Sequence, residues 1–208
     1  ILHISTDEAQ AERLIEALKF FAPELEVIYF PPWDCLPYDR VSPSSFVVSQ
    51  RIDALARMLQ PAKGRRLVVT TVSGLLMRVL PREELKDAAF IGAAGQKLDA
   101  EKLQTYLSGN GYLRVETVRE PGEFARRGGL FDLFPPGREQ PLRLDFFGTT
   151  LESIRSFDPA SQRTTGTETS LKLLPVTEFS LDEASQTRFR QNYREAFGAV
   201  LQDDPLYA

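Results

Sequence analysis

The chain has 208 residues, a formal net charge of -4 and 42% hydrophobic residues, which suits one large domain or two small ones with a buried core. No run of about eighteen apolar residues occurs, so we expect no membrane-spanning helix, and the mildly acidic charge argues against a module that grips DNA tightly. Cys35 is the only cysteine, which excludes an intramolecular disulfide and fits a reducing cytoplasm.

The start of the chain gives two further expectations. Residues 1–5 lack the charged and long apolar regions of a signal peptide, so we expect a cytoplasmic protein. Because the chain has no initiator methionine and begins within a predicted strand, we expect a processed or truncated form.

The first part of the chain alternates predicted strands and helices. Apolar and β-branched runs predict strands at residues 1–4, 25–30 and 67–72. Between them, one helix follows residues 5–8, a second is capped by Ser44 or Ser45, and a short third begins at Ser73. The first helix is expected to bury Ala11, Leu14, Ile15, Leu18 and Phe21. This order predicts an open parallel α/β unit.

The pattern changes near residue 86. One helix is predicted at residues 99–107, followed by short strands separated by turns. These strands are predicted at residues 112–118, 129–134, 142–147, 151–157 and 171–174. They indicate a small antiparallel β-sheet domain with a helix on one face, an α+β arrangement. A capping box at residues 180–183 opens a last helix, and its apolar stripe of Phe189, Tyr193, Phe197 and Val200 needs a partner.

The common signatures of catalysis are missing from the sequence. No G-x-x-x-x-G-K-[ST] phosphate loop or G-x-S-x-G motif occurs, and residues 92–95 predict only a turn before a helix. His3 lies within a predicted buried strand, and one histidine with one cysteine excludes a cysteine-rich zinc site. We therefore expect no catalytic residue, cofactor or metal in this chain.

Residues 141–148 have the composition of a protein-binding strand. Alternation divides them into two sets, Leu142, Leu144 and Phe146 toward a core, and Arg143, Asp145 and Phe147 outward. An exposed aromatic residue beside an arginine is typical of a binding hot spot. The alternative is that Phe147 packs under a neighbouring loop while Arg143 merely pairs with Asp145.

A second segment of interest contains Arg126 and Arg127 followed by Gly128 and Gly129. The glycines allow a bulge or a close backbone approach, which would present the arginines at a fixed angle. The alternative is a plain turn with solvated arginines.

Four motifs occur in this second part: Arg127-Gly128, Asp132-Leu133-Phe134-Pro135, Arg143-Leu144-Asp145-Phe146-Phe147-Gly148 and Ile154-Arg155-Ser156-Phe157-Asp158. Together they resemble a series shared by UvrB and the transcription-repair coupling factor family, Mfd. Residues 36–44 and 69–75 favour Mfd over UvrB. The resemblance runs from Ile1 to about Phe179, and it is specific only because the motifs occur together.

The resemblance implies a domain organisation. Residues 1–88 resemble part of a degenerate RecA-like helicase domain that has lost its ATP site, and residues 89–175 resemble the domain by which UvrB binds UvrA. Residues 176–208 would form a return helix into the first domain. The strand that would carry the phosphate loop in UvrB is expected before Ile1.

The resemblance also implies a partner and its contacts. The family's UvrA-contacting positions fall on Arg127, Arg143 and Phe147, and Asp132 matches an acidic position in the same surface. We expect alanine at the first three positions to weaken UvrA binding and to lower the melting temperature little. In the family, other domains bind RNA polymerase and DNA, and a C-terminal motor uses ATP with Mg. The UvrA surface is thought to be hidden against the protein's own C-terminal region.

The sequence is therefore compatible with three functions. The leading one is an adaptor module that recruits UvrA and links removal of stalled RNA polymerase to nucleotide excision repair. The alternative is a UvrB-like helicase fragment that binds nucleotide or damaged DNA, which a phosphate loop before Ile1 would favour. The third is a structural clamp that holds the motor inactive.

Overall fold

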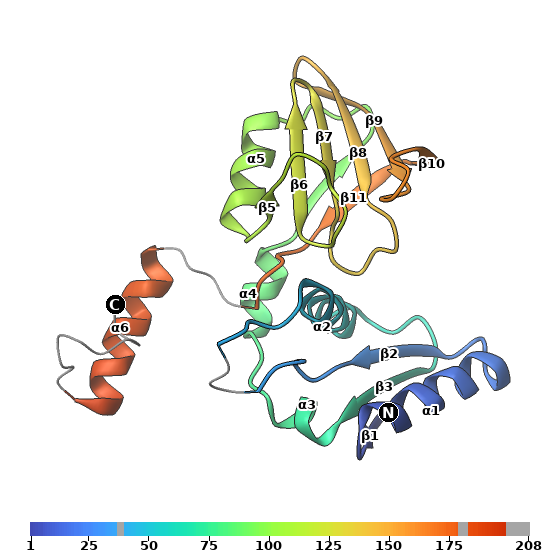
Figure 1. Ribbon diagram of the computed structural model, residues 1–208, viewed down its shortest axis with the longest axis vertical. Helices are drawn as coiled ribbons and strands as arrows, with labels where there is room; N and C mark the ends of the chain where they lie inside the picture. The colour runs from blue at the N-terminus through green and yellow to red at the C-terminus, as the bar shows by residue number, and fades with distance from the viewer. Residues whose placement is uncertain (37–39, 179–182, 199–208) are drawn as a thin grey trace. The chain divides into compact units, whose positions relative to one another are not determined.

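The computed structural model describes residues 1–36, 40–178 and 183–198. The chain divides into two compact units, Ile1–Glu178 and Phe179–Ala208. Helices and several sheets are mixed within the first unit, so the α+β class is confirmed (Figure 1). The finer division at residues 88–89 and 175–176 stays a prediction.

The first part of this unit is built on a parallel sheet, as predicted. Within the described residues its strands are β1 (Leu2–Ser5), β2 (Glu26–Phe30) and β3 (Arg66–Thr71), in the order β1-β3-β2. Parallel neighbours require crossover connections. Helix α1 (Glu8–Phe21) connects β1 to β2, and α2 (Ser45–Met58) connects β2 to β3.

The two crossover helices begin at side-chain caps. The Asp7 carboxylate accepts from the amide of Gln10 at 2.8 Å, and the Ser44 hydroxyl accepts from the amide of Val47 at 3.3 Å. Each cap satisfies an amide that has no partner within the helix. Of the two caps considered for α2, Ser44 is therefore the one used.

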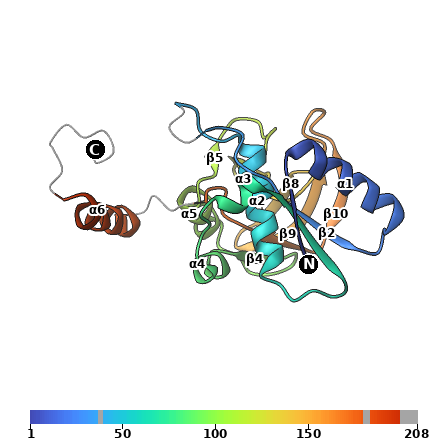
Figure 2. The same cartoon turned by 90° about the horizontal axis from the view of Figure 1, so that it is seen from below.

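Helices α1 and α2 lie on opposite sides of the sheet (Figures 1 and 2). Successive side chains of β2 point to opposite faces of the sheet. Ile28 and Phe30 pack with Ala54 of α2. Tyr29 faces α1. Its burial, and to a smaller extent the nearby negative charges of Glu8 and Glu12, raise the pKa of its hydroxyl to about 12. Strand β2 is thus covered on both faces, as its apolar residues predict, but the prediction that residues 1–4 form a buried strand is wrong, because Leu2 is 51% and Ile4 44% exposed.

The prediction that Phe21 is buried is wrong, because its ring is 80% exposed. Fourteen helical residues span about 21 Å, whereas the five residues of β2 span about 17 Å, so the last turn of α1 extends past the sheet. Phe21 instead contacts Phe20, with ring centroids 5.0 Å apart.

The second part of the first unit contains a larger sheet. Its strand order is β10-β9-β8-β7-β6-β5, and neighbouring strands are antiparallel except for β5 and β6. The strands are β5 (Leu113–Arg114), β6 (Glu123–Arg127), β7 (Leu130–Leu133), β8 (Leu142–Phe147), β9 (Thr150–Phe157) and β10 (Thr164–Glu168). Strands β4 (Phe90–Ala93) and β11 (Ser170–Leu173) form a separate pair.

Helix α5 (Ala100–Gly109) covers one face of this sheet, as predicted (Figure 1). Asp99 caps the helix by accepting from the amide of Glu101 at 2.9 Å. Leu103 and Leu107 of the helix are fully buried. They pack into the main core with Phe124, Phe131, Leu133, Leu142, Leu144, Phe146, Leu151 and Ile154 of the strands.

Several short elements differ from the predictions. Helix α3 (Val72–Leu76) begins at Thr71, whose hydroxyl accepts from the amide of Gly74, rather than at Ser73. The sequence did not predict α4 (Arg82–Asp87), β4, β6 or β10. The strand predicted at residues 112–118 is reduced to β5, because the chain leaves the sheet to form a loop that is anchored by buried Val118.

In the second unit, α6 (Glu183–Phe197) carries the predicted aromatic stripe. Tyr193 lies 5.8 Å from Phe189 and 4.8 Å from Phe197, measured between ring centroids. Residues 180–182 of the predicted capping box, and Val200, lie outside the described residues. Of the helices in the described ranges, none is long and apolar enough to cross a membrane.

Candidate functional site

The candidate site lies on the face of the six-stranded sheet opposite α5, which we call the outer face. Along β8, Leu142, Leu144 and Phe146 are buried in the main core, so the predicted alternation is confirmed. The remaining β8 residues, Arg143, Asp145 and Phe147, therefore belong to the outer face.

Asp132 and Arg143 face each other across β7 and β8. The Asp132 carboxylate accepts from Nε of Arg143 at 2.7 Å and from Nη2 at 2.8 Å. Asp132 is only 3% exposed, so it lies beneath the surface and holds Arg143 in place. The hydrogen bonds to Asp132 raise the pKa of Arg143, which stays charged.

Two other groups fix the Arg143 guanidinium. It lies over the ring of Phe157, 4.6 Å from the centroid, and its Nη1 donates to the carbonyl of Gln162 at 3.4 Å. The alternative pairing with Asp145 is wrong, because Asp145 instead accepts from Arg155 at 3.2 Å. A guanidinium carries five N–H donors, so donors of Arg143 remain for a partner.

Arg127 ends β6 on the same face and is exposed. Its Nη2 donates to the carbonyl of Glu116 at 2.6 Å. The predicted close approach beside it is confirmed: Gly128 has a φ of +63°, and a Cβ on Gly129 would lie 2.6 Å from the carbonyl oxygen of Phe146. The glycines thus set the position from which Arg127 extends.

Phe147 ends β8, immediately before the turn at Gly148. Its side chain is 75% exposed, so the alternative that it packs under a loop is wrong. Arg127 lies on β6 and Arg143 on β8, two strands apart, and these strands are about 10 Å from each other. The outer face therefore presents two arginines fixed by hydrogen bonds and an exposed aromatic ring. The alternation pattern predicted the outward position of Arg143 and Phe147.

The sequence analysis named Asp132 and included Phe157 in a family motif, but it did not predict that Phe157 and Gln162 support Arg143. Phe157 ends β9, and Gln162 lies in the segment between β9 and β10. Their role depends on contacts between distant segments, which no local pattern shows.

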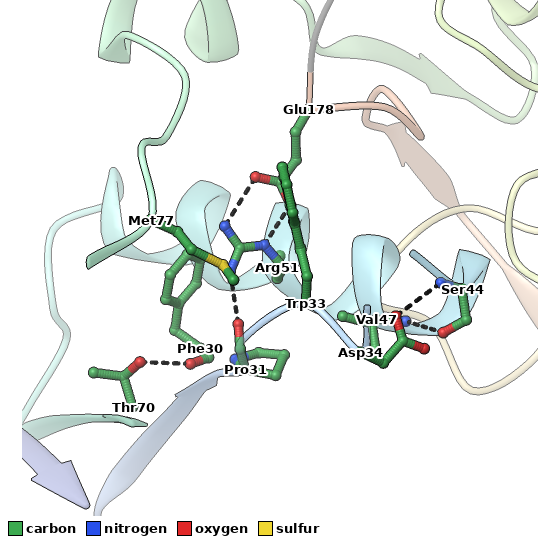
Figure 3. A network of polar contacts seen from close by, with 10 residues as sticks. All are labelled: Phe30, Pro31, Trp33, Asp34, Ser44, Val47, Arg51, Thr70, Met77 and Glu178. Atoms are coloured by element: carbon green, nitrogen blue, oxygen red, sulfur yellow. Dashed lines mark hydrogen bonds and ion pairs between the residues drawn. The ribbon is translucent and has the colours of Figure 1, made fainter. Parts of the chain in front are cut away.

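A second polar cluster lies at the carboxyl ends of β2 and β3, where open α/β sheets commonly bind ligands (Figure 3). Arg51 of α2 is fully buried and makes a two-pronged ion pair with Glu178, whose Oε2 accepts from Nη2 at 3.0 Å. Nη1 of Arg51 donates to the carbonyl of Pro31 at 2.7 Å.

Aromatic rings complete this cluster. The Arg51 guanidinium lies 4.2 Å from the ring centroid of Phe30 and 5.6 Å from that of Trp33. The indole of Trp33 donates to Glu178 at 3.0 Å. An anion from outside would have to displace Glu178 to reach Arg51. Groups of histidine, cysteine and acidic residues able to hold a metal are absent from the part of the chain that the structure describes.

Comparison with known proteins gives results for both parts of the chain. A family model described as "UvrB interaction domain" matches residues 93–179, which include the whole outer face. Transcription-repair-coupling factors match nearly all of the chain: that of Haemophilus influenzae is 38% identical over 96% of this chain, and that of Escherichia coli 36% over 100%. The Myxococcus xanthus protein is 37% identical over 89%.

This chain spans 17% and 18% of the lengths of the Haemophilus and Escherichia relatives, and 16% of the Myxococcus one. The likeness extends over both the parallel α/β part and the β-rich part. The chain therefore belongs to the transcription-repair-coupling factor family, as an N-terminal segment that contains a UvrB interaction domain.

Proposed function

We propose that this chain is an adaptor module that binds UvrA through its outer face and so links transcription to nucleotide excision repair. The observation that carries the proposal is the exposed ring of Phe147, which lies on the same sheet face as Arg127 and the held guanidinium of Arg143. An apolar anchor with arginine donors beside it has the composition of a binding hot spot.

The chemistry of the outer face suggests what UvrA must supply. Arg127 and Arg143 can each bind a carboxylate, and Arg143 is held with its charge intact by Asp132. Phe147 needs an apolar pocket. We infer an acidic surface on UvrA with an apolar depression between its carboxylates, because this arrangement would satisfy all three side chains at once.

We further propose that the parallel α/β part is a degenerate RecA-like domain with no catalytic role. The pairing of Arg51 with Glu178 at the carboxyl end of the sheet supports this reading, because the position is already filled by a carboxylate of the chain itself. ATP with Mg, RNA polymerase and DNA would be handled by parts of the family's proteins outside this segment.

Calorimetric titration of purified UvrA into the 208-residue chain tests the proposal. We expect saturable binding that Arg127→Ala weakens by at least about thirtyfold, since truncating an interface arginine leaves its partner unpaired. Arg65→Ala is the matched control, because Arg65 is an exposed arginine of the parallel α/β part. The proposal is wrong if UvrA does not bind, or if both variants bind equally well.

A further inference from the structure

Gln162 lies in the segment between β9 and β10, at the edge of the outer face. Its φ of +60° is left-handed, and among the described residues it is the only one other than glycine with a positive φ. Such a conformation is strained for a residue with a side chain and persists only where its surroundings hold it. Here the Gln162 amide N–H donates to the carbonyl of Asp158 at 2.8 Å.

The side chain of Gln162 joins two separate loops. Its Nε2 donates to the carbonyl of Val118 at 3.0 Å and to that of Pro159 at 2.8 Å. Val118 belongs to the loop between β5 and β6, 44 residues earlier in the sequence. Gln162 thus fastens that loop to the segment that follows β9.

Both arginines of the outer face depend on what Gln162 joins. Its own carbonyl accepts from Nη1 of Arg143 at 3.4 Å. The loop that it fastens carries the Glu116 carbonyl, which accepts from Arg127 at 2.6 Å. Val118 is fully buried in a small cluster with Phe157, the ring beneath Arg143. A continuous set of contacts therefore runs from Arg127 through Gln162 to Arg143.

We propose that Gln162 is a positioning residue of the binding surface: it holds the acceptor carbonyls that keep Arg127 and Arg143 oriented for UvrA. This inference rests on the proposed function. An arginine already held in its binding geometry loses less side-chain freedom when a partner docks, so affinity rises without a new contact. Gln162 itself need not touch UvrA.

The test uses Gln162→Met, which keeps the length of the side chain and removes its amide. Gln162→Gly is the second variant, because glycine adopts the left-handed conformation without strain. Gln104→Met is the matched control: Gln104 accepts from Arg126 at 2.6 Å, on the side of the sheet that α5 covers. Two quantities are measured in the 208-residue chain: ¹⁵N relaxation of the arginine Nε–H groups, and affinity for UvrA.

We expect both Gln162 variants to lower the order of the Arg127 and Arg143 side chains and to weaken UvrA binding about tenfold, because both side chains must then become ordered on binding. Gln104→Met should change neither quantity. Unchanged arginine order or unchanged affinity in both Gln162 variants overturns the inference. If Phe147→Ala still abolishes binding in that case, the proposed function stands; if the unaltered chain does not bind UvrA, both fail.

Discussion

Arg143 and Asp132 form a two-pronged ion pair across β7 and β8, in which the carboxylate is almost completely buried. This relationship changes what the sequence predicts for Arg143. The motif suggested a surface arginine whose loss would hardly affect stability. In the structure, however, its removal leaves a buried carboxylate without its charge partner.

Arg143→Ala should therefore lower both UvrA affinity and stability. Breaking a buried ion pair from one side costs about 3 kcal/mol or more, because the remaining charge stays desolvated. Urea unfolding of the purified chain measures this. Arg155→Ala is the control, since the Arg155–Asp145 pair is more exposed and should contribute less than about 1 kcal/mol. Equal stability of the two variants would contradict this reading of Asp132.

Gly129→Ala should destabilise the sheet beneath the outer face. The added Cβ would lie 2.6 Å from the backbone oxygen of Phe146, so β7 and β8 must move apart. Such overpacking costs about 1 to 3 kcal/mol. Gly64→Ala is the control, because a Cβ at Gly64 meets no atom within 4 Å. A melting temperature for Gly129→Ala equal to that of Gly64→Ala would show that the close approach is not required.

Glu178→Ala should be strongly destabilising, by about 3 to 5 kcal/mol, because it leaves the Arg51 guanidinium buried without its carboxylate. The double variant Arg51→Met/Glu178→Leu should recover most of this loss, since apolar groups of similar volume often replace a buried pair at little cost. Denaturant unfolding of the single and double variants gives the comparison. A double variant no more stable than Glu178→Ala would indicate that the cluster contributes through its hydrogen bonds to Pro31 and Trp33.

The sequence predicted the long helices and strands well, and it predicted correctly which β8 side chains face the core and which face outward. Continuous apolar runs and capping residues located β1, β2, β3, α2 and α5, and alternation placed Phe147 on an exposed face. These features depend on neighbours in the sequence. The short strands β5, β6 and β10 were misjudged or missed although they pair with neighbouring strands, because β5 has only two residues and β6 and β10 are mostly polar, so no apolar run marks them.

The residues of the candidate site could likewise be predicted only where the signal lies in the local sequence. The motif and the alternation identified Arg127, Arg143 and Phe147, but nothing local showed that Asp132 would be buried beneath Arg143. The link from Gln162 to Val118 joins residues 44 positions apart, and the left-handed conformation of Gln162 has no signal in its residue type. The support of the surface therefore came only from the structure.

The central claim is tested most directly by the affinity of UvrA for Phe147→Ala. Phe147 is 75% exposed, so its truncation should leave the melting temperature almost unchanged while weakening UvrA binding at least tenfold, about 1.4 kcal/mol or more. Phe20→Ala, which removes a ring that is 80% exposed on α1, should bind UvrA as the unaltered chain does. Full affinity of a folded Phe147→Ala chain would contradict the assignment of the outer face as the UvrA-binding surface.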